Sequence, residues 1–68
     1  EKYKKSFPLA LAAYNAGHKR VDRWLDINGD PRQNNISFEE WIELIPYKET
    51  RNYVQRVLEN LIVYKFLI

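Results

Sequence analysis

The sequence predicts an all-α fold of about four helices joined by short turns and one longer loop. Apolar residues recur at spacings of three and four along most of the chain, and no stretch alternates apolar and polar residues as a half-buried strand would. Gly, Asn, Asp and Pro residues separate the apolar segments. An aromatic content of 15% is too high for a disordered tail, so we expect a packed helical chain.

The first helix is predicted over residues 9–16, which are rich in the helix-favouring residues Ala and Leu. Ser6 is a suitable N-cap, and Pro8 suits the first turn of a helix. Gly17 is a natural stop, because glycine adopts the left-handed conformation that ends many helices.

The second helix is predicted over residues 18–26. Its apolar face consists of three residues at helical spacing, Val21, Trp24 and Leu25. The sequence Asn-Gly-Asp-Pro at residues 28–31 has strong turn chemistry and ends the helix. Residues 32–35 continue as a polar loop.

Ser37 begins a short third helix, because Ser37 and Glu40 have the spacing of a capping box. Its buried side is predicted to consist of Phe38, Trp41 and Ile42. Pro46 interrupts this helix, since proline restricts the residue before it and has no N–H to donate. Glu39 and Glu43, four residues apart, are expected to form a solvated face of the helix.

The last helix is predicted from residue 47 or 48 to near the end of the chain. An apolar stripe runs along it, formed by Tyr53, Val54, Val57, Leu58, Leu61, Ile62 and Tyr64. The apolar run at residues 61–64 leaves little polar face, and a helix of this kind is usually buried on most sides. We therefore expect another part of the protein, or a second copy of the chain, to cover it.

With 68 residues, the chain forms at most one domain and is marginally stable alone. It has no Cys, so neither a disulfide nor a thiolate metal site is available. The net charge is +2 and the Lys and Arg residues are scattered, so no nucleic-acid partner is predicted. Residues 1–5 show no secretory signal, and the apolar stretch 61–68 is too short to span a bilayer.

The segment Asp26–Glu40 resembles the two ends of an EF-hand calcium loop. If Asp26 takes the first ligand position, Pro31 stands where the loop needs Gly, and Ser37 stands where it needs the final acid. Placing Glu40 as the final ligand requires three extra residues in the loop. A polar loop without metal is the prediction, and a small helical binding module with this degenerate loop stays open as the alternative function.

Two motifs stand out. The first is Ala13-Tyr14-Asn15-Ala16-Gly17, followed by Arg20-Val21 and Trp24-Leu25; the second, over residues 45–54, is Ile-Pro-x-x-Glu-Thr-Arg-x-Tyr-Val. Each alone is an ordinary helix end or helix start. Together, in this order and spacing, they closely resemble the soluble lytic transglycosylase family over residues 8–65.

The resemblance implies a lysozyme-like helical fold with a cleft that holds a glycan. The family's catalytic residue is a Glu in a Glu-Ser motif upstream of the first motif, and a Gly-Leu-Met-Gln motif also lies upstream. The chain contains neither motif and has no Met. Residues 1–68 are therefore expected to be the C-terminal part of the catalytic domain.

The implied reaction cleaves the bond between N-acetylmuramic acid and N-acetylglucosamine in peptidoglycan. One Glu acts first as general acid and then as base, while the 6-hydroxyl of the sugar attacks and gives a 1,6-anhydro product. This internal hydroxyl replaces the second carboxylate that ordinary glycosidases need. The resemblance implies no cofactor, a location in the periplasm or cell envelope, and no activity for the 68 residues alone.

The resemblance also assigns roles to individual residues. Tyr53 is expected to face the missing Glu and help position it, and no residue of this segment is expected to be catalytic itself. Tyr14 and Asn15 are expected to line the cleft beside the substrate. Four further residues are expected to be structural, with the two charged ones holding the helix ends together: Gly17, Pro46, Glu49 and Arg51. The sequence departs from the family pattern at His18 and Lys19, where the family often has Pro and a small residue.

Overall fold

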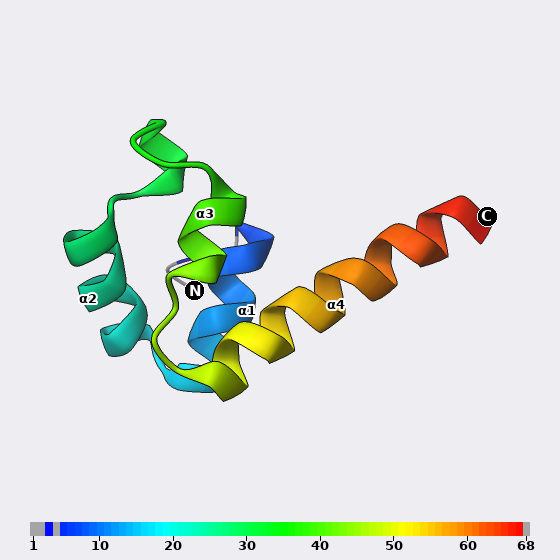
Figure 1. Ribbon diagram of the computed structural model, residues 1–68, viewed down its shortest axis with the longest axis horizontal. Coiled ribbons are helices and arrows are strands. Elements are labelled where there is room, and N and C mark those ends of the chain that lie inside the picture. Colours follow the sequence, from blue (N-terminus) through cyan, green and yellow to red (C-terminus); the bar gives the residue numbers. More distant parts are fainter. Residues whose placement is uncertain (1–2, 4, 68) are drawn as a thin grey trace.

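The computed structural model describes residues 3 and 5–67, and these residues form four α-helices (Figure 1). The helices are α1 (Phe7–Ala16), α2 (His18–Asn28), α3 (Phe38–Glu43) and α4 (Lys48–Leu67), and a 3₁₀ helix η1 (Pro31–Gln33) lies in the loop between α2 and α3. The described residues contain no strand. The predicted all-α fold is therefore confirmed.

The first half of α4 packs against α1 and α3, and the second half extends away from the other helices as a single rod (Figure 1). Helix α1 lies at the centre of this arrangement, because it contacts both α2 and α4. Helix α3 contacts α4 from another side. The C-terminal end of α1 and the N-terminal end of α4 thus come together, although they are far apart in the sequence.

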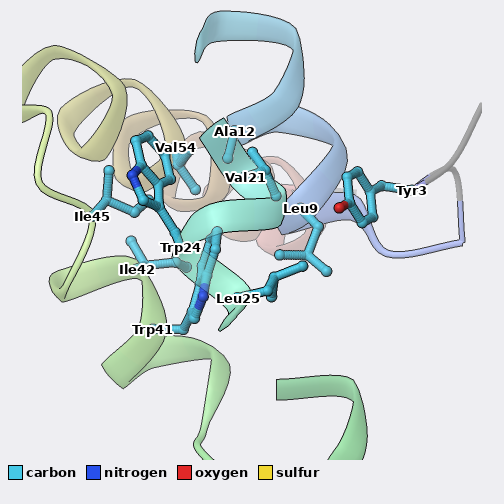
Figure 2. Packing of buried hydrophobic residues seen from close by; sticks show 10 residues of the cluster. All are labelled: Tyr3, Leu9, Ala12, Val21, Trp24, Leu25, Trp41, Ile42, Ile45 and Val54. Carbon is cyan, nitrogen blue, oxygen red and sulfur yellow. The ribbon is translucent and has the colours of Figure 1, made fainter. Parts of the chain in front are cut away.

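The core lies between the four helices, and Figure 2 shows its members converging from all of them. It consists of Tyr3, Leu9, Ala12, Val21, Trp24, Leu25, Trp41, Ile42, Ile45 and Val54. The rings of Trp24 and Trp41 are tilted toward each other with centroids 6.4 Å apart. Burial of each large apolar side chain contributes about 1.5–3 kcal/mol, so this cluster is the main stabilising feature of the chain.

Helix α1 begins at Phe7, two residues before the predicted start. Ser6 is at the N-cap position as predicted, but its hydroxyl forms no capping hydrogen bond and is buried without a partner among the described residues. Pro8 is one cause, because a capping side chain bonds the second or third helical N–H and Pro8 removes the second. The predicted side-chain cap is therefore wrong, although the position is right.

The predicted turn and polar loop after α2 also contain a short 3₁₀ helix that the sequence analysis did not predict. Helix α2 runs two residues beyond its predicted end, to Asn28, and η1 follows at Pro31–Gln33. The Asp30 carboxylate caps η1 by accepting from the Arg32 backbone N–H at 2.9 Å, and it also forms an ion pair with the Arg32 guanidinium at 2.8 Å. An Asp followed by Pro is the signal that predicts such a turn.

Helix α3 begins with the predicted capping box. The Ser37 hydroxyl accepts a hydrogen bond from the Glu40 N–H at 3.1 Å, and the Glu40 carboxylate accepts from the Ser37 N–H at 3.5 Å. Trp41 and Ile42 are buried as predicted, and Phe38 packs partly buried against the core.

Helix α4 buries only the first part of its predicted apolar stripe within the described chain. Val54 is fully buried, and Tyr53 and Leu58 pack partly buried against the core. From Leu61 onward, every described residue is exposed. Among the described helices, none combines the length and the apolar character that a membrane crossing requires.

Candidate functional site

A groove of about 450 Å³ runs along the junction of α1 and α4. Asn15, near the end of α1, lies on one side of it, and Tyr53, in the second turn of α4, lies on the other. These two residues are 38 positions apart in the sequence, and both were predicted to contact substrate. The groove is completed by Glu49, Asn52, Arg56, Val57 and Asn60.

The side chain of Asn15 is held by a residue that the sequence analysis did not select. The Thr50 hydroxyl donates a hydrogen bond to the Asn15 side-chain oxygen at 2.6 Å, and Thr50 is only 1% exposed. Because the Asn15 oxygen is used, its amide N–H₂ group is oriented by this bond. Thr50 stands between two motif residues that were selected, and a hydroxyl at that place in the motif is the signal that could have identified it.

Tyr53 combines a fixed ring with an unused hydroxyl. Its ring packs partly buried against the core and also lines the groove. Among the described residues, no group forms a hydrogen bond with its hydroxyl. The phenol is therefore held at the groove with its hydrogen-bonding capacity unused by the described residues, which is what a residue that positions an external group requires.

Tyr14 lies apart from the other two predicted substrate residues. It is 84% exposed and is not part of the groove lining. Successive residues of a helix point about 100° apart, so the side chain of Tyr14 leaves α1 in a different direction from that of Asn15. The structure thus brings Asn15 and Tyr53 together and leaves Tyr14 on the adjoining surface of α1.

The four residues predicted to be structural have different environments. Gly17 joins α1 to α2 with φ of 96°, a value that side chains disfavour, although a Cβ there would meet no atom within 4 Å. The Arg51 guanidinium donates to the Ile45 carbonyl at 3.0 Å and so ties α4 to the turn before it. Pro46 lies exposed in that turn.

The environment of Glu49 differs from the one expected of a residue that holds helix ends together. It is exposed, lines the groove, and forms neither a hydrogen bond nor an ion pair with any described residue. Its position in the first turn of α4 favours a negative charge through the helix dipole, and this explains its presence without a partner.

Two acidic residues of the Asp26–Glu40 segment, Asp30 and Glu40, have partners within the chain. The hydrogen bond from the Arg32 side chain lowers the pKa of the Asp30 carboxyl, and Glu40 belongs to the capping box of α3. Within the described residues, no group of three or more His, Asp or Glu side chains is arranged to hold a metal ion. Asp30 and Glu40 thus stabilise the turn and the helix that follows.

Comparison with known proteins agrees with the motifs. A family model described as the soluble lytic transglycosylase helical domain matches residues 44–68. The putative soluble lytic murein transglycosylase of Haemophilus influenzae is 38% identical over 66 residues, which are 97% of this chain and 10% of the relative. The soluble lytic murein transglycosylase of Escherichia coli is 42% identical over 60 residues, 88% of this chain and 9% of the relative.

The soluble lytic murein transglycosylase of Salmonella typhimurium is 49% identical over 50 residues, 74% of this chain and 7% of the relative. The chain thus spans about a tenth or less of the length of these relatives. No solved structure matches it. These matches show that nearly the whole chain is similar to a segment of the soluble lytic murein transglycosylases, as its two motifs predicted.

Proposed function

We propose that this chain is the C-terminal part of the catalytic domain of a lytic transglycosylase in the bacterial periplasm or cell envelope. The parent enzyme cleaves the bond between N-acetylmuramic acid and N-acetylglucosamine and leaves a 1,6-anhydro end. One observation carries the proposal: Asn15 and Tyr53, from the two motifs, line the same groove. The named relatives support it, because the match to the Haemophilus influenzae relative spans 97% of this chain and so includes both motifs.

In this proposal the general acid and base is a Glu from a preceding segment of the same domain. The hydroxyl of Tyr53 hydrogen-bonds that carboxyl and orients it toward the glycosidic oxygen, so Tyr53 is a positioning residue. The amide of Asn15 bonds a polar group of the sugar, and the exposed ring of Tyr14 offers an apolar face to the next sugar along the strand. The 6-hydroxyl of the sugar takes the place of water, so one carboxylate is sufficient.

The same proposal accounts for the exposed end of α4. Leu61, Ile62, Val63, Tyr64, Phe66 and Leu67 are between 37% and 86% exposed. A surface of this kind on a soluble segment marks an interaction site. We assign it to the remainder of the catalytic domain, with self-association of the chain as the competing occupant.

A chimera tests the proposed activity. The 60 residues of the Escherichia coli relative that match this chain would be replaced by the corresponding residues of this chain. Release of 1,6-anhydro muropeptides from purified peptidoglycan is then measured by chromatography and mass spectrometry. We expect the chimera to be active and the 68-residue chain alone to be inactive, since it lacks the catalytic Glu.

Two variants of the chimera separate the role of Tyr53 from a general effect of tyrosine removal. Tyr53→Phe keeps the packed ring and removes the hydroxyl, and we expect activity to fall by about tenfold or more, the equivalent of one transition-state hydrogen bond. Tyr64→Phe, near the end of the same helix, serves as the matched control: it keeps the apolar ring that the proposed contact with the remainder of the domain uses, so it should keep full activity. A folded chimera without activity would contradict the proposed function.

A further inference from the structure

A second groove, of about 560 Å³, lies at the junction of α1 and α2, on the neighbouring surface of the molecule. Its lining consists of Ala16, Gly17, His18, Lys19, Arg20, Arg23 and Tyr47. We propose that this basic groove binds a carboxylate of the peptide stems that peptidoglycan glycan strands carry. The inference rests on the proposed function, because it concerns the same substrate.

The basic groove carries positive charge that no described residue neutralises with an ion pair. Lys19, Arg20 and Arg23 are cationic at neutral pH, and its lining contains no Asp or Glu. Among the described residues, no carboxylate forms an ion pair with any of these three side chains. A concave surface of one charge attracts ligands of the opposite charge, so the groove favours an anion.

Arg20 is held in place for such a ligand. One of its guanidinium nitrogens donates to the Ala16 carbonyl at 3.1 Å, and the guanidinium carbon lies 5.0 Å from the centre of the Tyr47 ring. Tyr47 is itself packed edge-on against the buried Trp24, with ring centroids 5.5 Å apart. The guanidinium is thus fixed by two contacts, and this lowers the entropic cost of binding a carboxylate through its remaining N–H groups.

The backbone at the start of α2 also favours a bound anion. Gly17 is the N-cap of α2 and provides no side-chain acceptor for the first N–H groups of the helix. The N-terminus of a helix carries a partial positive charge. It therefore adds to the field of Lys19, Arg20 and Arg23.

The position of the basic groove beside the first groove indicates which anion the basic groove binds. Asn15 lines the first groove, and the next residue, Ala16, lines the second. Likewise Glu49, in the first turn of α4, lines the first groove, and Tyr47, just before α4, lines the second. A glycan strand is neutral in its sugar rings and negative in its peptide stems. A strand bound along the first groove would therefore bring a stem carboxylate to the basic groove.

Binding of defined probes to the 68-residue chain tests the inference. The probes are a muropeptide with free carboxylates, the same muropeptide with every carboxyl amidated, the free stem peptide without sugar, and inorganic phosphate. Dissociation constants are measured by calorimetry for the unaltered chain, Arg23→Gln, Lys19→Gln and the control Lys65→Gln. Lys65 is an exposed lysine at the far end of α4 and lies in neither groove.

We expect the free-carboxylate muropeptide and the free peptide to bind about tenfold more tightly than the amidated probe, the value of one charged hydrogen bond. Arg23→Gln and Lys19→Gln should each reduce this preference, because Arg20 still donates to the carboxylate but the positive field is weaker; Lys65→Gln should keep it, and raised salt should weaken it. Equal binding of amidated and free probes overturns the inference. Competition by phosphate at equal concentration also overturns it, since the groove would then bind any small anion.

The free peptide separates this inference from the proposed function. It contains no sugar, so its binding depends on the basic groove alone. An active chimera whose muropeptide binding ignores the carboxylates would overturn the inference and leave the proposed function intact. Binding of the free peptide by a folded but inactive chimera would overturn the proposed function and leave the anion-binding property of the basic groove intact.

Discussion

The buried hydroxyl of Thr50 donates a 2.6 Å hydrogen bond to the side-chain oxygen of Asn15, and this bond joins the end of α1 to the first turn of α4. The two residues belong to different motifs and are 35 positions apart. Their bond fixes one wall of the first groove relative to the other. The orientation of a residue proposed to contact substrate thus depends on a neighbour that never reaches the groove.

Thr50→Val should lower the free energy of unfolding by about 1 kcal/mol, because valine keeps the branched shape and removes the donor. Urea unfolding of the unaltered chain, Thr50→Val, Asn15→Ala and the double variant forms a double-mutant cycle. A coupling energy of about 1 kcal/mol is expected for a direct hydrogen bond. Additive losses would show that the two side chains do not interact in solution.

Val54→Ala should destabilise the chain by about 2 kcal/mol, since Val54 is fully buried and its lost methyl groups leave a cavity. Val63→Ala is the matched control on the same helix. Val63 is 56% exposed, and alanine favours helix more than valine does, so its stability should be unchanged or slightly higher. Equal effects of the two substitutions in thermal unfolding would contradict the packing of α4 described above.

Ser37→Ala should lower the free energy of unfolding by about 1 kcal/mol, the usual value of a lost N-cap. The substitution removes the acceptor for the Glu40 N–H. Ser37→Asp keeps an acceptor at the same position and should restore most of the loss. The free energy of unfolding in urea measures both. A Ser37→Ala variant as stable as the unaltered chain would show that the capping box is not formed.

High pH should lower the free energy of unfolding, because it ionises Tyr3. Burial, followed by the hydrogen bond to Asp22, raises the pKa of Tyr3 from 10.0 to about 12. The folded state therefore holds this proton more tightly than the unfolded state. The resulting stabilisation is complete below pH 10 and is lost as the pH rises toward about 12.

Tyr3→Phe removes this titration and should flatten the fall in unfolding free energy between pH 10 and about 12. Tyr64→Phe, an exposed tyrosine, is the control for the general effect of high pH on the chain. An identical pH dependence for the unaltered chain and Tyr3→Phe would contradict the burial of Tyr3.

The fold could be predicted from the sequence because local signals and apolar periodicity agree along most of the chain. Val21, Trp24 and Leu25 are one helix face in the sequence and one buried face in the structure. The capping box was readable because both partners lie within four residues. The end of α4 was less predictable, since periodicity shows that Leu61 and Ile62 are apolar but not which surface covers them.

The candidate site was only partly predictable, because a motif names residues and not their directions. Asn15 and Tyr53 were selected and do share a groove, whereas the neighbouring Tyr14 faces elsewhere. The bond between Thr50 and Asn15 depends on how α1 and α4 pack. Such a long-range contact has no local signal in one sequence.

The rod formed by the second half of α4 gives one continuous helix two levels of local stability. Amide hydrogens around Val54 lie beside the core, so we expect them to exchange with solvent mainly when the whole chain unfolds. Those of residues 61–67 are protected only by the helix itself, and helical segments shorter than about 12 residues are marginal in water. Helix α4 therefore frays from its C-terminal end, and any surface that covers residues 61–67 would be detected as slowed exchange there, with the rest of the chain unchanged.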